Sequence, residues 1–237
     1  MKAYKKYAST IKEENLNMLR KGVKAREVYF EQEDTEMQQK SKQKLALFVL
    51  QKQLQNLKQK ELLLLMVFIS AGVLGRILMQ PLPSVEPLTF FAMLSGWLFG
   101  SKKGFITGAS AAYLSNFFMF GGQGIWTIFQ MLGFGAAGFL AGFLRKKAKI
   151  LECLMITAIA TLLFEIIMNI SSITFLPSSI FTAFFFALPF TVAHLISNLT
   201  FSTLLPKLKS HIYEKGGFNE KEICLQLLNR LRGKNEK

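Results

Sequence analysis

The sequence has few of the groups on which disulfide-stabilised proteins, metalloproteins and common enzymes depend. Its two cysteines, Cys153 and Cys224, are far apart and fall on the cytoplasmic side of the topology derived below. Neither a disulfide framework nor a metal site is therefore predicted. The chain contains no P-loop pattern, no H-E-x-x-H and no G-x-S-x-G, so we expect no enzyme and no cofactor. Its first 60 residues are hydrophilic, so no cleavable signal peptide is expected.

Long apolar runs are abundant instead. Hydrophobic residues make up 51% of the 237, with 23 phenylalanines, and they are concentrated between Leu62 and Leu205. This composition is typical of a membrane protein. The formal charge is +14, but the basic residues fall mostly in the two tails and in short loops between apolar runs. A membrane protein keeps its cytoplasmic charge there, so we expect a lipid bilayer and no nucleic acid as partner.

Six apolar segments are predicted to cross the membrane as helices. One long span over 88–119 would place Lys102 and Lys103 near its centre, at a cost of about 2.5 to 3.5 kcal/mol each. A hairpin turning at Gly100 to Gly104 avoids this cost. The predicted spans are 62–79, 88–100, 104–119, 126–144, 150–170 and 179–205.

The loops alternate in charge, which gives the orientation. Basic residues occur at 52–60, 102–103, 145–149 and 207–209, whereas the loops at 80–87, 120–125 and 171–178 contain no Lys or Arg. The positive-inside rule then places both termini in the cytoplasm. The sequence predicts an all-α, multi-pass protein of the cell membrane. Its three parts are a cytoplasmic basic helical extension at 1–61, a six-span substrate-binding domain at 62–205 and a cytoplasmic tail at 206–237.

The extension has its own pattern. Between Lys40 and Lys60 there are six lysines and no acid, with Leu47, Leu50, Leu54 and Leu57 at helical spacing. This pattern predicts an amphipathic helix on the cytoplasmic lipid surface, running into the first span. A solvated or partner-binding helix fits the same pattern, and both interpretations stay open.

Polar side chains from several spans fall at one depth. With a rise of about 1.5 Å per residue, Arg76 lies about 21 Å and Glu165 about 22 Å from the inner ends of their spans. The same outer level contains Tyr113, Asn116, Gln123, Trp126, Thr127, Gln130 and Asn169. Charges at this depth predict a ligand cavity, or else a structural Arg76–Glu165 ion pair between two helices. Counted from the outer end of the sixth span, His194 and Asn198 fall in its inner half. We expect them to hydrogen-bond between helices, away from this cluster.

Small residues in the fourth span match a nucleotide-binding pattern without its context. Gly133 to Gly138, GFGAAG, fits G-x-G-x-x-G, but no strand precedes it and it lies within an apolar span. We therefore expect close helix packing there.

A longer series of residues matches a known transporter family. The residues are Gly75-Arg76-Ile77, Pro83 to Thr89, Gly96, Phe99-Gly100, Gly104-Phe105, Gly108-Ala109, Ser115 to Phe118, Gln123 to Met131 and Gly138 to Gly142. Over residues 71–142 the chain resembles the substrate-binding S components of energy-coupling factor (ECF) transporters, and it is most similar to the cobalamin branch. At 124–130 the family usually has Gly-Pro-Trp-Thr-Pro-Trp-Gln, whereas this chain has GIWTIFQ. Both prolines and the second Trp are absent, which loosens the entrance to the site, residues 120–131, and removes a flat stacking surface.

The resemblance implies a subunit that captures a vitamin-like small molecule at the outer face, cobalamin being favoured. It also implies a transmembrane T component and two cytoplasmic ATPase subunits as partners. In the family a small-x-x-x-small pair on the first helix packs against the T component, and Ala71 and Gly75 match it. The residues expected to bind substrate are Arg76, Glu86, Asn116, Gln123, Trp126, Thr127, Gln130, Glu165 and Asn169.

Two other interpretations remain. A membrane scaffold or regulatory protein would act through its basic N-terminal helix. An integral-membrane enzyme acting on lipid, with Glu165 as acid or base, is disfavoured because the sequence has no catalytic constellation or cluster of metal ligands.

Overall fold

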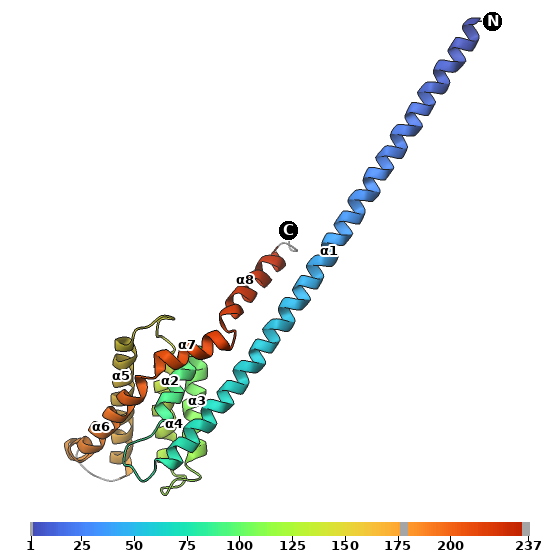
Figure 1. Ribbon diagram of the computed structural model, residues 1–237. Coiled ribbons are helices and arrows are strands. Elements are labelled where there is room, and N and C mark those ends of the chain that lie inside the picture. Colours follow the sequence, from blue (N-terminus) through green and yellow to red (C-terminus); the bar gives the residue numbers. More distant parts are fainter. Residues whose placement is uncertain (1, 176–179, 234–237) are drawn as a thin grey trace. The chain divides into compact units, whose positions relative to one another are not determined.

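The computed structural model describes residues 2–175 and 180–233, whose regular structure is entirely helical (Figure 1). The helices are α1 (Lys2–Leu78), α2 (Leu88–Phe99), α3 (Ser101–Ser115), α4 (Trp126–Ala141), α5 (Ile150–Phe175), α6 (Ile180–Ser202), α7 (Leu205–Lys215) and α8 (Asn219–Gly233). The expected all-α fold is therefore confirmed. The start of the predicted sixth span, at Ser179, lies outside the described residues.

The chain forms two compact units. One contains residues 1–54 and 223–237, and the other contains residues 55–222. The second unit includes the C-terminal part of α1 and all of α2 to α7, and every residue expected to bind substrate belongs to it.

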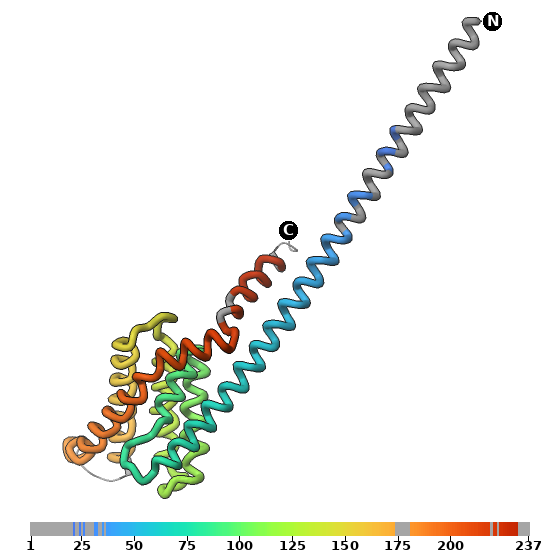
Figure 2. Tube along the Cα trace, in the orientation of Figure 1, coloured from blue at the N-terminus to red at the C-terminus, as the bar shows by residue number. Residues whose placement is uncertain are grey.

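Helix α1 is continuous from Lys2 to Leu78. Figure 2 shows its part from Met37 to Leu78 in colour. The helix predicted over 40–60 runs into the first span without a break, as expected. No proline occurs before Pro81, so nothing in the backbone chemistry interrupts the helix. It ends where the prolines of the loop at 79–87 begin, as predicted.

The predicted hairpin between α2 and α3 is present. Gly100 separates the two helices with a φ of 97°, a left-handed conformation that favours glycine. Helix α3 begins at Ser101, so Lys102 and Lys103 lie in its first turn and not in the turn before it. The 12 residues of α2 and the 15 of α3 correspond to about 18 and 22 Å of helix.

Helices α2, α3 and α4 approach one another backbone to backbone. A Cβ atom added at Gly138 would overlap the carbonyl of Gly104, and one added at Gly108 would overlap that of Phe134. Gly96 on α2 likewise faces the carbonyl of Gly138. The close packing expected from the small residues of α4 is thus confirmed, and it sets the spacing of the helices that support the site below.

Among the described residues, three helical segments are long and apolar enough to cross a membrane: Met37–Leu78, Ile150–Ile173 and Phe181–Lys215. Helices α2 and α4 are apolar but shorter. Large apolar side chains are exposed on these segments, including Phe181, Phe185 and Phe186 on α6. Such surfaces are costly in water and favourable in lipid, so the chain has the features of a multi-pass membrane protein.

Candidate ligand-binding site

A cavity of about 360 Å³ lies where the end of α1 and the loop at 79–87 meet α4, α5 and α6. Its lining residues are Arg76, Met79, Gln80, Leu82, Pro83, Ser84, Val85, Glu86, Met119, Gln130, Phe164, Glu165, Met168, Phe190 and His194. Apolar walls with a few converging polar groups are typical of small-molecule sites.

Arg76 is the central cation of this cavity. It lies in the last turn of α1 with 6% of its surface exposed, and its Nη1 donates hydrogen bonds of 2.8 Å to Ser115 Oγ and to Asn116 Oδ1. Its Nε lies 2.5 Å from Glu86 Oε2, because the proline-rich loop turns the chain back toward α1. The guanidinium carbon lies 5.5 Å from the ring centroid of Phe134. One arginine thus joins α1, the following loop, α3 and α4.

Asn116 extends this network to α4. Its Nδ2 donates to Thr127 Oγ1 at 3.0 Å and to Gln130 Oε1 at 2.7 Å. Thr127 Oγ1 also accepts a 3.2 Å hydrogen bond from the Gly124 amide. Asn116 is therefore held at both ends of its amide, and it orients Arg76 on one side and Gln130 on the other.

A second charged cluster joins α5 and α6. Glu165 Oε1 lies 2.6 Å from His194 Nδ1, and Glu165 Oε2 accepts a 3.1 Å hydrogen bond from Thr191 Oγ1. The proximity to a carboxylate favours the tautomer with hydrogen on Nδ1. The side chains of Glu165 and His194 are 13% and 3% exposed, so the pair is largely shielded from solvent.

These contacts correct one expectation and decide between two alternatives. His194 hydrogen-bonds between helices as expected, but its partner is Glu165, so it lies within the polar cluster and not away from it. Arg76 pairs with Glu86, so the alternative of an Arg76–Glu165 ion pair is wrong. Counting residues assumes that each helix runs along the membrane normal, whereas Figure 1 shows α6 inclined to α5. An inclined helix advances less in depth per residue, so the position of His194 was misjudged. Asn198 does hydrogen-bond between helices, through a 2.9 Å contact to Thr161 Oγ1.

Three lining residues have a buried nitrogen atom without a hydrogen-bond partner among the described residues. These atoms are Arg76 Nε, which approaches Glu86 without hydrogen-bond alignment, Gln80 Nε2 and His194 Nε2. An unsatisfied buried polar atom costs about 1 to 3 kcal/mol. Gln80 Nε2 is a donor, whereas the Nε2 of a neutral His194 with hydrogen on Nδ1 is an acceptor. A ligand that offers acceptors and a donor to these atoms would therefore recover part of that cost.

The remaining predicted residues lie around this cavity without lining it. Asn116 hydrogen-bonds to Arg76 and Gln130, which line the cavity, and Thr127 accepts a hydrogen bond from Asn116. Asn169 Nδ2 donates to the main-chain carbonyl of Glu165 at 2.9 Å. Gln123 Nε2 donates to the carbonyl of Tyr113 at 2.8 Å in an exposed position, and Trp126 is 40% exposed with its ring against Gly124.

Sequence reasoning missed several contributors. Gln80 and Phe164 line the cavity, and Ser115 accepts from Arg76. The polarity of Gln80 immediately after the first span was a signal that pointed to the cavity, whereas nothing distinguished Phe164 from the other phenylalanines.

The two positions matched to the T-component contact have different surroundings. A Cβ added at Gly75 would overlap the ring of Pro87, so its missing side chain admits the loop of this chain. Ala71, one turn earlier, is half-buried. The contact with a T component stays a prediction.

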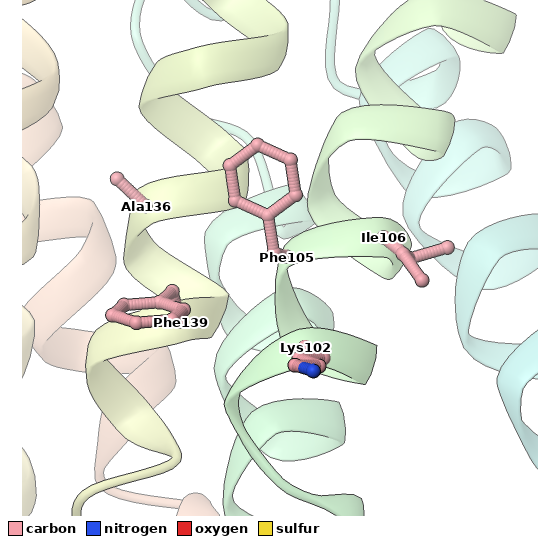
Figure 3. A pocket seen from close by; sticks show the side chains of 5 residues that line it. All are labelled: Lys102, Phe105, Ile106, Ala136 and Phe139. Atoms are coloured by element: carbon pink, nitrogen blue, oxygen red, sulfur yellow. The ribbon is translucent and has the colours of Figure 1, made fainter.

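A larger hollow, of about 560 Å³, lies between α3 and α4. Figure 3 shows its five lining side chains, Lys102, Phe105, Ile106, Ala136 and Phe139. Four of them are apolar and the fifth is a lysine in the first turn of α3. This hollow has no converging polar groups, which makes it a poor candidate for a specific polar ligand.

Comparison with known proteins identifies a family. No curated protein and no solved structure matches the chain. Residues 56–214 match a family described as a family of unknown function, DUF6580. The match covers well over half of the chain and includes every residue of the cavity, while most of the N-terminal extension lies outside it. The chain belongs to the DUF6580 family.

Proposed function

We propose that this protein is the ligand-capturing subunit of a membrane importer of the ECF type. The observation that carries the proposal is the cavity itself, in which an ion pair, Arg76–Glu86, and a hydrogen-bonded pair, Glu165–His194, meet at the ends of apolar helices. Charged groups at membrane depth are costly unless they serve a ligand or one another. The loops at this level contain no Lys or Arg, which favours the outer side of the membrane.

The topology that goes with this function has six spans and both termini in the cytoplasm. It is supported by the alternation of basic and non-basic loops and by the three long apolar segments. Helices α2, α3 and α4 are shorter than a hydrocarbon core of about 30 Å, which a membrane accommodates by local thinning.

The size of the cavity restricts the ligand. Its volume of about 360 Å³ is near the lower end of the range for small-molecule sites. Cobalamin is several times larger, so its binding would require the loops at 79–87 and 117–125 to move apart. A small vitamin-like molecule with polar groups at two ends and an apolar body fits the cavity as it stands.

The partners are a T component and two ATPase subunits. This part of the proposal rests on the resemblance over residues 71–142 and on the absence of a P-loop pattern in the chain. Uphill transport requires an energy source, so a second chain must supply it.

Calorimetric titration of the full-length protein in detergent tests the proposal. The ligand panel contains cobalamin and smaller vitamins, and the variants are Glu165→Gln and Arg76→Gln. Gln123→Ala is the matched control, because its hydrogen bond is exposed and lies outside the cavity. We expect one ligand to bind, with affinity reduced at least tenfold in both cavity variants and unchanged in the control. Failure to bind any vitamin, together with failure to copurify with T component and ATPases, would reject the proposal.

A scaffold or regulatory function is the second candidate, favoured by the 77 continuous residues of α1. Deleting residues 1–54 distinguishes the two. Ligand binding survives this deletion if capture is the function, because the cavity is built entirely from residues 76–194. Loss of the cellular phenotype with intact ligand binding would favour the scaffold.

A further inference from the structure

A second polar cavity lies at the opposite end of α4 from the candidate ligand site. Its volume is about 400 Å³, and it is formed by the end of α2, the loop between α4 and α5, and α7. Its lining residues are Trp97, Lys146, Lys147, Ala148, Pro206, Lys209, Ser210, Tyr213 and Glu214. None of them takes part in the ligand cavity described above.

Lys209 is held in this cavity by aromatic rings. Its Nζ lies 5.1 Å from the ring centroid of Trp97 and 4.9 Å from that of Tyr213, and it donates to the carbonyl of Lys146. Trp97 is itself fixed by a 2.9 Å hydrogen bond from Nε1 to the carbonyl of Arg145. The ammonium group is thus positioned by cation–π contacts and a carbonyl, and no carboxylate pairs with it in the described part of the chain.

The cavity carries a net positive charge. Lys146, Lys147 and Lys209 line it, and the one acid in the lining is Glu214, whose Oε1 accepts a 2.9 Å hydrogen bond from Ser210. Like charges that line one cavity repel one another, and an anion bound in the cavity would relieve this repulsion. Lysine is a common binder of phosphate, as a compact point charge.

We propose that this cavity binds the phosphate of an anionic phospholipid headgroup in the leaflet on the basic side of the protein. The neighbouring chain favours a lipid over a soluble phosphate. Phe143, Leu151 and Leu204, which flank the lining residues in sequence, are 67%, 63% and 53% exposed and provide an apolar surface for acyl chains. Trp97 and Tyr213 are residues typical of the membrane interface, where headgroups lie.

Lipid retention by the purified full-length protein tests this site. The protein is delipidated in detergent, and phosphatidylglycerol, phosphatidylcholine or inorganic phosphate is titrated while bound adducts are counted by native mass spectrometry. We expect phosphatidylglycerol to bind in preference to phosphatidylcholine. Each of Lys147→Gln and Lys209→Gln should weaken that binding about fivefold, which is the contribution typical of one lysine at an anionic surface.

Lys149→Gln is the matched control. Lys149 is exposed in the same loop but does not line the cavity, so its replacement should leave binding unchanged. Equal losses in Lys149→Gln and Lys147→Gln would show general attraction to the basic surface and overturn the site. Binding without preference for phosphatidylglycerol would overturn it as well.

Two further measurements distinguish a lipid headgroup from free phosphate and distinguish lost binding from misfolding. Competition by inorganic phosphate at concentrations similar to the lipid would overturn the assignment to a lipid headgroup. Because Lys209→Gln removes contacts to two rings, Lys209→Arg is included, and it should retain binding by keeping the charge. Lys147 is exposed, so Lys147→Gln should fold normally. If Lys209→Gln fails to fold, the result for Lys147→Gln decides the test.

Discussion

Replacing Arg76 by alanine should destabilise the membrane domain more than any exposed polar substitution. The change removes the shared partner of Ser115, Asn116 and Glu86, and it leaves the Glu86 carboxylate with 15% of its side chain exposed and without its cation. Water therefore compensates the carboxylate only in part. The C-terminal ends of α1 and α3 and the adjoining part of α4 lose the group that joins them.

The magnitude follows from the contacts. Each hydrogen bond from a charged donor contributes about 1.5 to 3 kcal/mol, so the two from Nη1 give about 3 to 6 kcal/mol. Removing one partner of a buried ion pair independently costs about 3 to 5 kcal/mol. The two estimates describe the same desolvated guanidinium and cannot be added. We expect a loss of about 3 to 4 kcal/mol in the free energy of unfolding.

Unfolding by sodium dodecyl sulfate in mixed micelles, followed by circular dichroism, measures this loss. Gln123→Ala is the control and should stay within about 0.5 kcal/mol of the unchanged protein, because its hydrogen bond is exposed. A double-mutant cycle with Glu86→Gln should give a coupling free energy above about 1 kcal/mol. A loss below about 1 kcal/mol for Arg76→Ala, or strict additivity in the cycle, would refute the assignment of Arg76 as the structural hub.

Three further predictions concern other parts of the membrane domain. Glu61→Gln should lower the free energy of unfolding by about 1 to 3 kcal/mol in the same assay, because this buried carboxylate (3% exposed) binds two half-exposed lysines, and no loss would contradict that role. Gly138→Ala should cost more than about 1 kcal/mol by separating α3 from α4, whereas Gly121→Ala, with open space around it, should not; equal effects would argue against backbone contact. His194→Gln should retain the fold but weaken ligand affinity by about tenfold, and affinity unchanged within twofold by calorimetry would remove this residue from the site.

Much of the fold could be predicted from the sequence because apolar length and charge placement are local properties. The hairpin at Gly100, the end of α1 at the proline-rich loop and the dense packing around Gly138 all follow from the chemistry of one segment. The full length of α1 was less evident, because the pattern that predicted a helix running into the first span covered residues 40–60 and not the whole chain before them.

Polarity within apolar segments is readable in one dimension, so the sequence could assign nine side chains to one site, and four of them, Arg76, Glu86, Gln130 and Glu165, line the cavity. How these groups pair could be learned from the folded chain alone. Pairing depends on the rotation and inclination of each helix, and small and aromatic residues on every face of these spans leave both undefined in a one-dimensional pattern. The inclination of α6 brings His194 to Glu165, and the turn of the loop at 79–87 brings Glu86 to Arg76, because contacts across helices are set by three-dimensional packing.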